Sequence, residues 1–289
     1  MKGDLLKLKS KSKFLFFIPA LSLLVPFVVL PLFQTIYMSF LCDGSLGLCS
    51  YIEALQDPET IDSIIHNLTW VLIHLPASIM LGLFFALLLQ WKIKGASLIK
   101  AIIFSGMVIP MIVGGLLIRF SFEKGVGIVP QLFRLMGVPS LYKTWTAYPD
   151  IALYALIIGS VWLWTGFNMV VFSAGLAAIP KEYIEAAMVD GASKLQVFLR
   201  IILPLLKPSL TIALLTTFIY ELKIFDIVYV ATQGGPGDAS MVLALLVYFF
   251  GFREYNLGKA AAVAVLLVMI SLVPAVQIAK LTTAGAKRG

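Results

Sequence analysis

Residues 182–208 read EYIEAAMVDGASKLQVFLRIILPLLKP, a charged segment between two long apolar ones. Its first half is rich in good helix formers, and Pro180 fits the first turn of a helix, where its missing amide is not needed. Gly191 supplies a turn position that tolerates a positive φ, and a second helix is expected over about 193–202. Residues 180–208 are therefore predicted to form a helix-turn-helix lying along a surface.

The chain on either side has the composition of a membrane protein. Hydrophobic residues make up 60% of it and charged residues only 13%, against the roughly 25% charged residues of a soluble globular domain. Five runs without Asp, Glu, Lys or Arg are each long enough to cross hydrocarbon as a helix, namely 14–40, 64–91, 101–118, 151–180 and 260–279. These runs predict an all-α, polytopic membrane protein that forms a single domain over residues 1–289.

A sixth span is predicted over 208–230, although it contains three charged residues. Unpaired charge in hydrocarbon is costly, so Glu221, Lys223 and Asp226 are expected to face a partner, a cavity or the membrane interface. Prolines within several of the spans predict kinked helices packed in a bundle, because neighbouring helices can satisfy the freed carbonyl groups.

The distribution of Lys and Arg predicts the orientation, since basic residues near short loops are retained in the cytoplasm. The loop 41–63 has no basic residue and five acidic ones, which places it outside. Both termini and residues 180–208 are then cytoplasmic in a plasma or inner membrane. Fifteen of the 22 basic residues belong to the inner set: Lys2, Lys7, Lys9, Lys11, Lys13, Lys92, Lys94, Lys100, Lys181, Lys194, Arg200, Lys207, Lys280, Lys287 and Arg288.

A signal peptide and a nucleic-acid partner are less favoured as reasons for the basic residues. The start of the chain resembles a secretory signal peptide, but its apolar run is about twice the usual length and no small-residue cleavage site follows, so a retained first helix is expected. Anionic lipid headgroups are a sufficient partner for the net charge of +7, which leaves no reason to infer a nucleic-acid partner.

The outer loop holds Cys42 and Cys49, the only cysteines. A disulfide persists outside the cytoplasm, but spacing does not reveal geometry, so a disulfide and a pair of free thiols both stay open. His66 and His74 lie eight residues apart with no carboxylate at ligand spacing. Packing or hydrogen bonding is expected of them, and no metal site is predicted.

Two motifs give the chain a family resemblance. Residues 182–208 contain Glu185-Ala186-Ala187, then Gly191, then Ile201-Ile202-Leu203-Pro204, and residues 232–237 read TQGGPG. The first resembles the EAA signature of permeases of binding-protein-dependent ATP-binding cassette (ABC) importers. The second, in the expected order after Phe225-Asp226, is similar to an element of the sugar-transporting branch.

The resemblance implies that residues 180–208 are a coupling loop that docks on a soluble ATPase. The residues implied in coupling are Glu182, Glu185, Ala186, Ala187, Asp190, Gly191, Ile202 and Pro204. Glu185 would contact basic groups of the ATPase, while the small residues allow close approach. The alternative is an amphipathic helix that touches only lipid headgroups.

The resemblance also implies the partners. These are a second permease, expected to be a different homologous chain, two copies of a cytoplasmic ATPase, and an external solute-binding protein, besides membrane lipid. The chain has no GxxxxGK[ST] phosphate loop. It is therefore expected to bind no cofactor and to catalyse no reaction alone, with ATP and Mg²⁺ used by the ATPase.

Five residues in the fourth and fifth predicted spans are candidates for the solute path. Aromatic faces stack on the C–H patches of sugars, while amide, hydroxyl and carboxylate groups bind their hydroxyls. For each of them except Glu221, a structural role in packing, interface anchoring or helix–helix hydrogen bonding is favoured over solute contact. Pairing with the partner permease is as good a role for Glu221 as solute binding. The candidates are Trp164, Asn168, Thr217, Tyr220 and Glu221.

The apolar run 241–252 is too short to span a membrane. It is expected at the outer interface, where it could meet the binding protein.

An ATP-driven sugar importer is the favoured function of the chain. Import of a polyol or another small polar solute is the second. A secondary transporter or channel is the third, but it predicts paired intramembrane acids or inverted repeats, which the sequence lacks.

Overall fold

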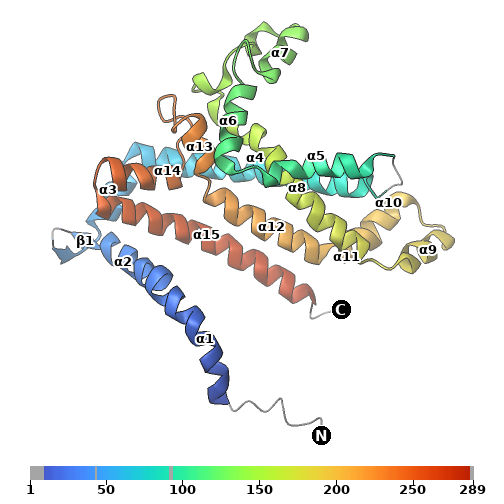
Figure 1. Cartoon of the computed structure of the whole chain (residues 1–289), viewed down its shortest axis with the longest axis horizontal. Helices are drawn as coiled ribbons and strands as arrows, with labels where there is room; N and C mark the ends of the chain where they lie inside the picture. The colour runs from blue at the N-terminus through green and yellow to red at the C-terminus, as the bar shows by residue number, and fades with distance from the viewer. Residues whose placement is uncertain (1–9, 43, 91–93, 287–289) are drawn as a thin grey trace.

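A computed structural model describes residues 10–42, 44–90 and 94–286, which are almost entirely helical (Figure 1). Six of the basic residues that predict the orientation, Lys2, Lys7, Lys9, Lys92, Lys287 and Arg288, lie outside the described residues. The long helices run α1 (Ser10–Leu24), α2 (Leu30–Ser39), α4 (Pro58–Leu88), α5 (Ala96–Val108), α6 (Met111–Ser121), α8 (Ala152–Ala177), α12 (Lys207–Leu222) and α15 (Leu257–Ala286).

Shorter elements connect these helices. They are η1 (Val25–Val29), β1 (Leu41–Cys42), β2 (Ser45–Leu46), α3 (Cys49–Gln56), α7 (Ile128–Leu135), η2 (Pro139–Leu141), η3 (Trp145–Ala147), α9 (Lys181–Val189), α10 (Lys194–Val197), η4 (Phe198–Ile202), α11 (Leu203–Leu205), α13 (Asp226–Ala231), α14 (Leu243–Tyr248) and η5 (Phe249–Arg253).

Among the described residues, three stretches are long and apolar enough to cross a membrane, or up to five if each bent helix pair is one span. The three are Phe17–Ser39, Pro58–Leu88 and Ala152–Ala177. They coincide with the first, second and fourth predicted spans. The prediction of several apolar helices in a bundle is therefore confirmed.

The span predicted over 101–118, where a kink was expected, is a sharply bent pair of helices. The chain leaves the helix at Ile109 and Pro110, and α6 continues at 108° to α5. The physical reason is Pro110, because a proline disfavours the helical conformation of the residue before it and removes a backbone donor.

The prediction of one helix over 208–230 is wrong. Helix α12 ends at Leu222, and a separate α13 begins at Asp226. The Asn67 side chain donates a hydrogen bond of 3.4 Å to the Leu222 carbonyl, so the break leaves a helix-end acceptor satisfied within the protein. Non-helical backbone at membrane depth is tolerated where its polar groups find partners within the protein.

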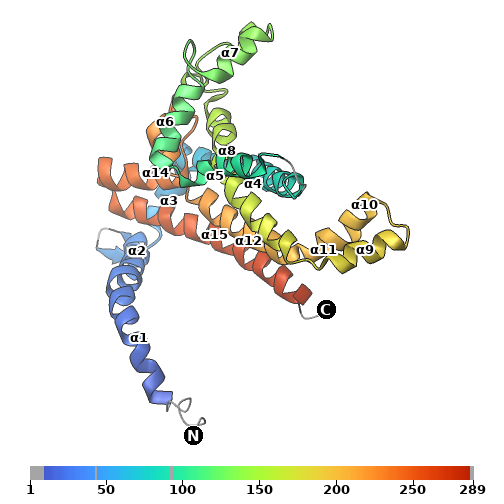
Figure 2. The ribbon, with the colours of Figure 1, turned by 45° about the vertical axis from the view of Figure 1, so that its right-hand side comes forward.

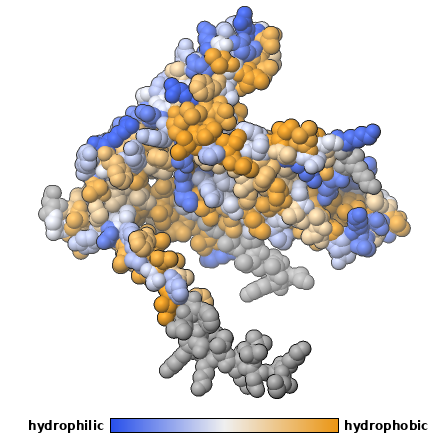
Figure 3. All heavy atoms as spheres, in the orientation of Figure 1, coloured by the Kyte–Doolittle hydropathy of each residue, from blue (hydrophilic) through white to orange (hydrophobic). Residues whose placement is uncertain are grey.

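The core is built around α4 and α8, which pack along each other, with α5, α6 and α12 against α8. Apolar side chains spread over the outside of the bundle as well, and polar ones gather over its α9–α10 end (Figure 3). Helices α1 and α2 leave the bundle as an arm that is joined through α2 to α15 (Figure 2). Such apolar outer surfaces suit a chain that is surrounded by lipid and partner helices.

The segment 241–252 differs from its prediction. Leu243, Leu245 and Leu246 of α14 are fully buried, as is Met241 just before it. Two hydrogen bonds from α4 hold this segment: Asn67 Oδ1 accepts from the Leu243 amide at 2.8 Å, and His66 Nδ1 lies 2.8 Å from the Met241 carbonyl. The first half of the run is thus part of the core, whereas Phe252 at its end is exposed.

The loop between α2 and α3 contains a small hairpin that was not predicted. Strand β1 pairs antiparallel with β2, with Leu41 opposite Leu46 and Cys42 opposite Ser45. Cys42 and Cys49 form a disulfide next to it. Of the two alternatives left open by the sequence, the structure has the bonded pair.

Candidate functional site

A small cavity lies where the broken helices meet the core. Its volume is about 90 Å³, and it is lined by residues of α4, α6, α8, α12 and the start of α13. Aromatic, hydroxyl and charged side chains share its wall, which is unusual within an otherwise apolar bundle. The lining residues are Trp70, His74, Met111, Ser160, Trp164, Tyr220, Glu221, Lys223, Ile224, Phe225 and Asp226.

A buried ion pair forms one side of this cavity. His74 Nδ1 lies 2.6 Å from Glu221 Oε1, and both side chains are only 1% exposed. The second atoms of the two groups, His74 Nε2 and Glu221 Oε2, have no hydrogen-bond partner among the described residues. Because unsatisfied buried polar atoms are costly, these two are available to a water molecule or to a bound solute.

The aromatic rings beside the pair form a small cluster. The ring centroids of Trp164 and Tyr220 are 4.9 Å apart, and Lys223 Nζ lies 5.5 Å from the Tyr220 ring. Trp164 is buried, whereas Tyr220 is 55% exposed. The cavity thus combines aromatic faces with a carboxylate and a hydroxyl, which are the groups that bind sugars.

Three of the five predicted solute-path residues meet at this cavity, namely Trp164, Tyr220 and Glu221. Asn168 and Thr217 are not among its lining residues. They are buried and bond each other, with Thr217 Oγ1 donating to Asn168 Oδ1 at 3.2 Å. Glu221, Lys223 and Asp226 were expected to face a partner, a cavity or the membrane interface, and all three line this cavity.

The contribution of α4 to the cavity was not predicted from the sequence. Its buried polar residues recur at helical spacing on one face, at Thr60, Ser63, Asn67, His74 and Ser78. This period of three, four and seven residues within an apolar span could have indicated a helix face turned toward a polar interior. The expectation that His66 and His74 take part in hydrogen bonds is confirmed.

Among the described residues, no three His, Cys, Asp or Glu side chains gather in a way that could hold a metal ion.

A helix-turn-helix occupies the segment predicted for it and projects from one end of the bundle (Figure 1). Helix α9 begins after Pro180 and ends at Val189, and α10 begins after Ser193. Gly191 between them has φ +83° and nothing within 4 Å of the place where a side chain would begin. The turn therefore requires a residue that tolerates the left-handed region, as Gly191 does.

The start of α10 has a cap that was not predicted. Ser193 Oγ accepts from the Gln196 amide at 3.3 Å, and Gln196 Oε1 accepts from the Ser193 amide at 2.8 Å. This reciprocal arrangement is a capping box, and it fixes where the second helix begins. Its signal in the sequence is a serine followed by glutamine three residues later.

Helix α9 is exposed on nearly every side. None of its residues is buried in this chain, and Glu182, Glu185, Ala186, Asp190 and Gly191 are all exposed. Ala187 and Ile202 are half-buried, and Pro204 is exposed. Its half-buried Ile184 packs against the core of the bundle, so α9 is attached on one side and exposed on the others.

The outer TQGGPG loop, at the end of α13, is held by a serine. Ser240 Oγ donates to the Gly235 carbonyl at 2.7 Å and lies 2.8 Å from Thr232 Oγ1. The peptide bond between Gly235 and Pro236 is cis. The hydrogen bonds of Ser240 hold the loop as a turn.

The bundle, its polar cavity and its projecting helix-turn-helix are those of the membrane component of a transport system. Residues 78–281 match the model of the binding-protein-dependent transport system inner membrane component. The chain belongs to this family, and it is a permease of a binding-protein-dependent ABC importer.

Relatives and solved structures agree with this assignment. The chain is 51% identical to a probable ABC transporter permease protein of Pyrococcus horikoshii, over 94% of this chain and 98% of that one. It is 31% identical to the trehalose/maltose transport system permease protein of Thermococcus litoralis, over 91% of each. A chain of a bacterial ABC transporter involved in import of the acidic polysaccharide alginate has the same fold, with TM-score 0.84 and 18% identity over 95% of this chain and 96% of that one.

Proposed function

We propose that this permease moves a sugar from an external solute-binding protein into the cytoplasm, driven by a separate ATPase. In this proposal it crosses the membrane six times and has both termini in the cytoplasm. It pairs with a second, homologous permease. Two copies of the ATPase bind on the cytoplasmic side and use ATP and Mg²⁺. The observation that carries the proposal is the cavity built from Trp164, Tyr220 and the His74–Glu221 pair.

The chemistry of this cavity favours a neutral, polyhydroxylated solute. Glu221 already has a hydrogen-bonding partner in His74 inside the chain, so a solute need not bring a charge of its own. Its free Oε2 accepts from a hydroxyl group, and a Trp164–Tyr220 ring pair offers an apolar face. The trehalose/maltose permease among the relatives supports a sugar as that solute.

The size of the cavity supports a paired permease. At about 90 Å³ it has room for roughly three waters, whereas pockets for small molecules measure about 300 Å³ or more. A second permease that faces this wall would supply the rest of the site. Alternating access then requires that the two permeases move relative to each other.

The exposed helix α9 is the proposed ATPase contact. Its acidic first turn and small residues suit a groove with basic groups, and the Gly191 turn carries no side chain that would hold a partner away. Because Lys181, Lys194, Arg200 and Lys207 lie in the same segment, this end of the bundle belongs on the cytoplasmic side. Closure of the ATPase pair would push α9 and α10 and thereby the membrane helices.

Co-purification with uptake tests the proposal. The tagged chain is isolated in mild detergent from its native membrane, its companions are identified by mass spectrometry, and uptake of radiolabelled maltose and trehalose is measured in cells. We expect a second permease, an ATPase and uptake that stops on ATP depletion. Recovery of the chain alone, with uptake that survives ATP depletion, would refute it and favour a secondary transporter.

A further inference from the structure

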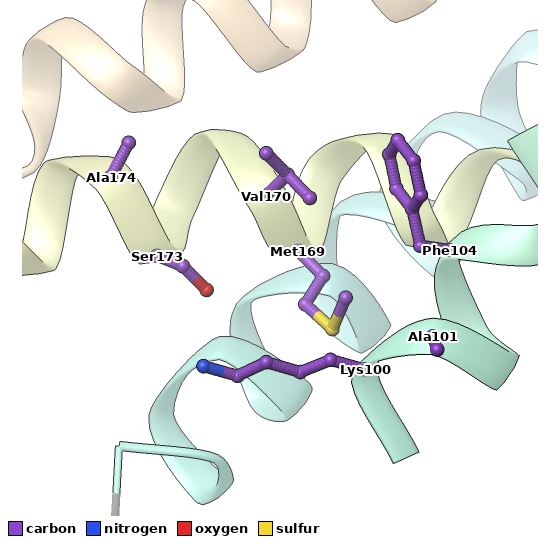
Figure 4. A pocket seen from close by; sticks show the side chains of 7 residues that line it. All are labelled: Lys100, Ala101, Phe104, Met169, Val170, Ser173 and Ala174. Carbon is purple, nitrogen blue, oxygen red and sulfur yellow. The ribbon is translucent and has the colours of Figure 1, made fainter. Parts of the chain in front are cut away.

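A second pocket lies between α5 and α8, away from the polar cavity. Its volume is about 450 Å³, and Lys100, Ala101, Phe104, Met169, Val170, Ser173 and Ala174 line it. Figure 4 shows the Lys100 ammonium and the Ser173 hydroxyl at one end of the pocket and Phe104 at the other. The pocket thus has a cationic, hydrogen-bonding end and an apolar wall.

The two helices create the pocket by diverging. They are in close contact at two glycines: a side chain at Gly166 would meet the Ile103 carbonyl oxygen at 2.6 Å, and one at Gly106 would meet the Trp162 carbonyl oxygen at 3.0 Å. Lys100 and Ala101 lie about one helical turn closer to the start of α5. There the helices separate and a groove opens between them.

The charge at the mouth of the groove is uncompensated. Lys100 makes no ion pair among the described residues. It belongs to the early part of α5 and is close in the chain to two further lysines, Lys92 and Lys94. In the proposed orientation this is the inner membrane interface, where the leaflet is rich in anionic headgroups.

We propose that this groove is a binding site for an anionic phospholipid. The Lys100 ammonium pairs with the headgroup phosphate, the Ser173 hydroxyl donates to a headgroup oxygen, and the part of an acyl chain next to the headgroup lies along Phe104, Met169 and Val170. Only the sidedness is taken from the proposed function. The site itself holds for any transported solute.

Native mass spectrometry of the purified, detergent-solubilised transporter tests this site. Phosphatidylglycerol or phosphatidylcholine is added at equal concentration, and bound lipid is counted while detergent is stripped. We expect retention of phosphatidylglycerol over phosphatidylcholine. Lys100→Gln should weaken that retention roughly five-fold, which is the worth of one lysine at an anionic surface, and Lys100→Arg should restore it.

Two further variants separate the groove from general surface charge. Ala101→Phe fills the groove without changing charge and should also reduce retention. Lys94→Gln removes an exposed lysine near the start of α5 and should leave the retention of phosphatidylglycerol unchanged. Equal loss in Lys94→Gln, equal retention of both lipids, or no effect of Ala101→Phe would overturn the proposal. Because lipid binding is counted directly, failure of the sugar assignment leaves these outcomes unaffected.

Discussion

His74 on α4 and Glu221 on α12 form a buried ion pair, with Nδ1 and Oε1 2.6 Å apart and almost no surface of either side chain exposed. The two residues are 147 positions apart in the chain. The pair thus ties the end of α12, just before its break, to the middle of the longest helix of the bundle. Glu221 also lines the polar cavity, and its Oε2 has no hydrogen-bond partner among the described residues.

Breaking this pair should reduce the stability of the protein most when one of the two groups is left buried without its partner. We expect His74→Ala to destabilise the protein by about 3–5 kcal/mol, because it leaves the Glu221 carboxylate buried and unpaired. Glu221→Gln keeps an oxygen that accepts from His74 and should cost only about 1 kcal/mol. The thermal unfolding midpoint in detergent measures both.

A second carboxylate in the same cavity is the control for this test. Asp226 lines the cavity and has no ion pair among the described residues. Asp226→Asn should therefore change stability little. If Asp226→Asn and His74→Ala lower the midpoint equally, the pair has no special role.

Sugar uptake at equal protein amount should fall in Glu221→Gln if Oε2 contacts the solute.

Gly191→Asp should abolish uptake while leaving the chain folded in the membrane. The position has open space around it, so the added side chain costs only the strain of a positive φ, about 1–2 kcal/mol. The same side chain would stand in the proposed ATPase groove. Uptake and the amount of co-purified ATPase measure the effect.

Gly137→Asp is the matched control for that change. Gly137 has φ +74° and nothing within 4 Å, but it follows α7, far from α9. Gly137→Asp should keep both uptake and the ATPase. Loss of the ATPase in both variants, or in neither, would argue against docking at Gly191.

The outer disulfide should be detectable in the native protein. Cys42 and Cys49 should react with a maleimide only after reduction. A loop closed by a sequence separation of seven is worth roughly 2–3 kcal/mol in the chain-entropy treatment, so Cys42→Ser together with Cys49→Ser should loosen the hairpin and α3. Labelling of the unreduced protein would contradict the bonded state.

Gly82 should tolerate no side chain. A Cβ there would overlap the Asn168 side chain and lie 2.9 Å from the Asn168 carbonyl carbon. Gly82→Val should therefore separate α4 from α8, cost about 1–3 kcal/mol, and lower the thermal midpoint by roughly 5 °C. Ala177→Val on the exposed end of α8 is the control and should have little effect.

Local sequence signals predicted the elements that are governed by neighbours in the chain. The apolar runs located the helices, and Pro180 and Gly191 located the bounds of α9 and its turn, since capping and turn preferences act over a few residues. Pro110 was expected to kink a helix, but no local signal gives the 108° size of the bend.

Long-range contacts explain the failures. No local signal stops α12 at Leu222; its end is held by Asn67, 155 residues earlier. The burial of α14 depends on the same asparagine and on His66. In the candidate site, Glu221 was predicted because a charged side chain in a membrane helix is energetically costly and needs a partner. That this partner is His74 depends on tertiary packing.

The contact between α5 and α8 at Gly106 and Gly166 has a mechanical consequence. Small residues at a helix crossing let the two backbones approach closely, so the two helices are held together at that point. The crossing is therefore suited to act as a pivot. Rotation there would change the distance between the two helices near Lys100. Near Pro110, on the other side of the crossing, that distance would change in the opposite sense, which is the motion that a two-sided gate requires.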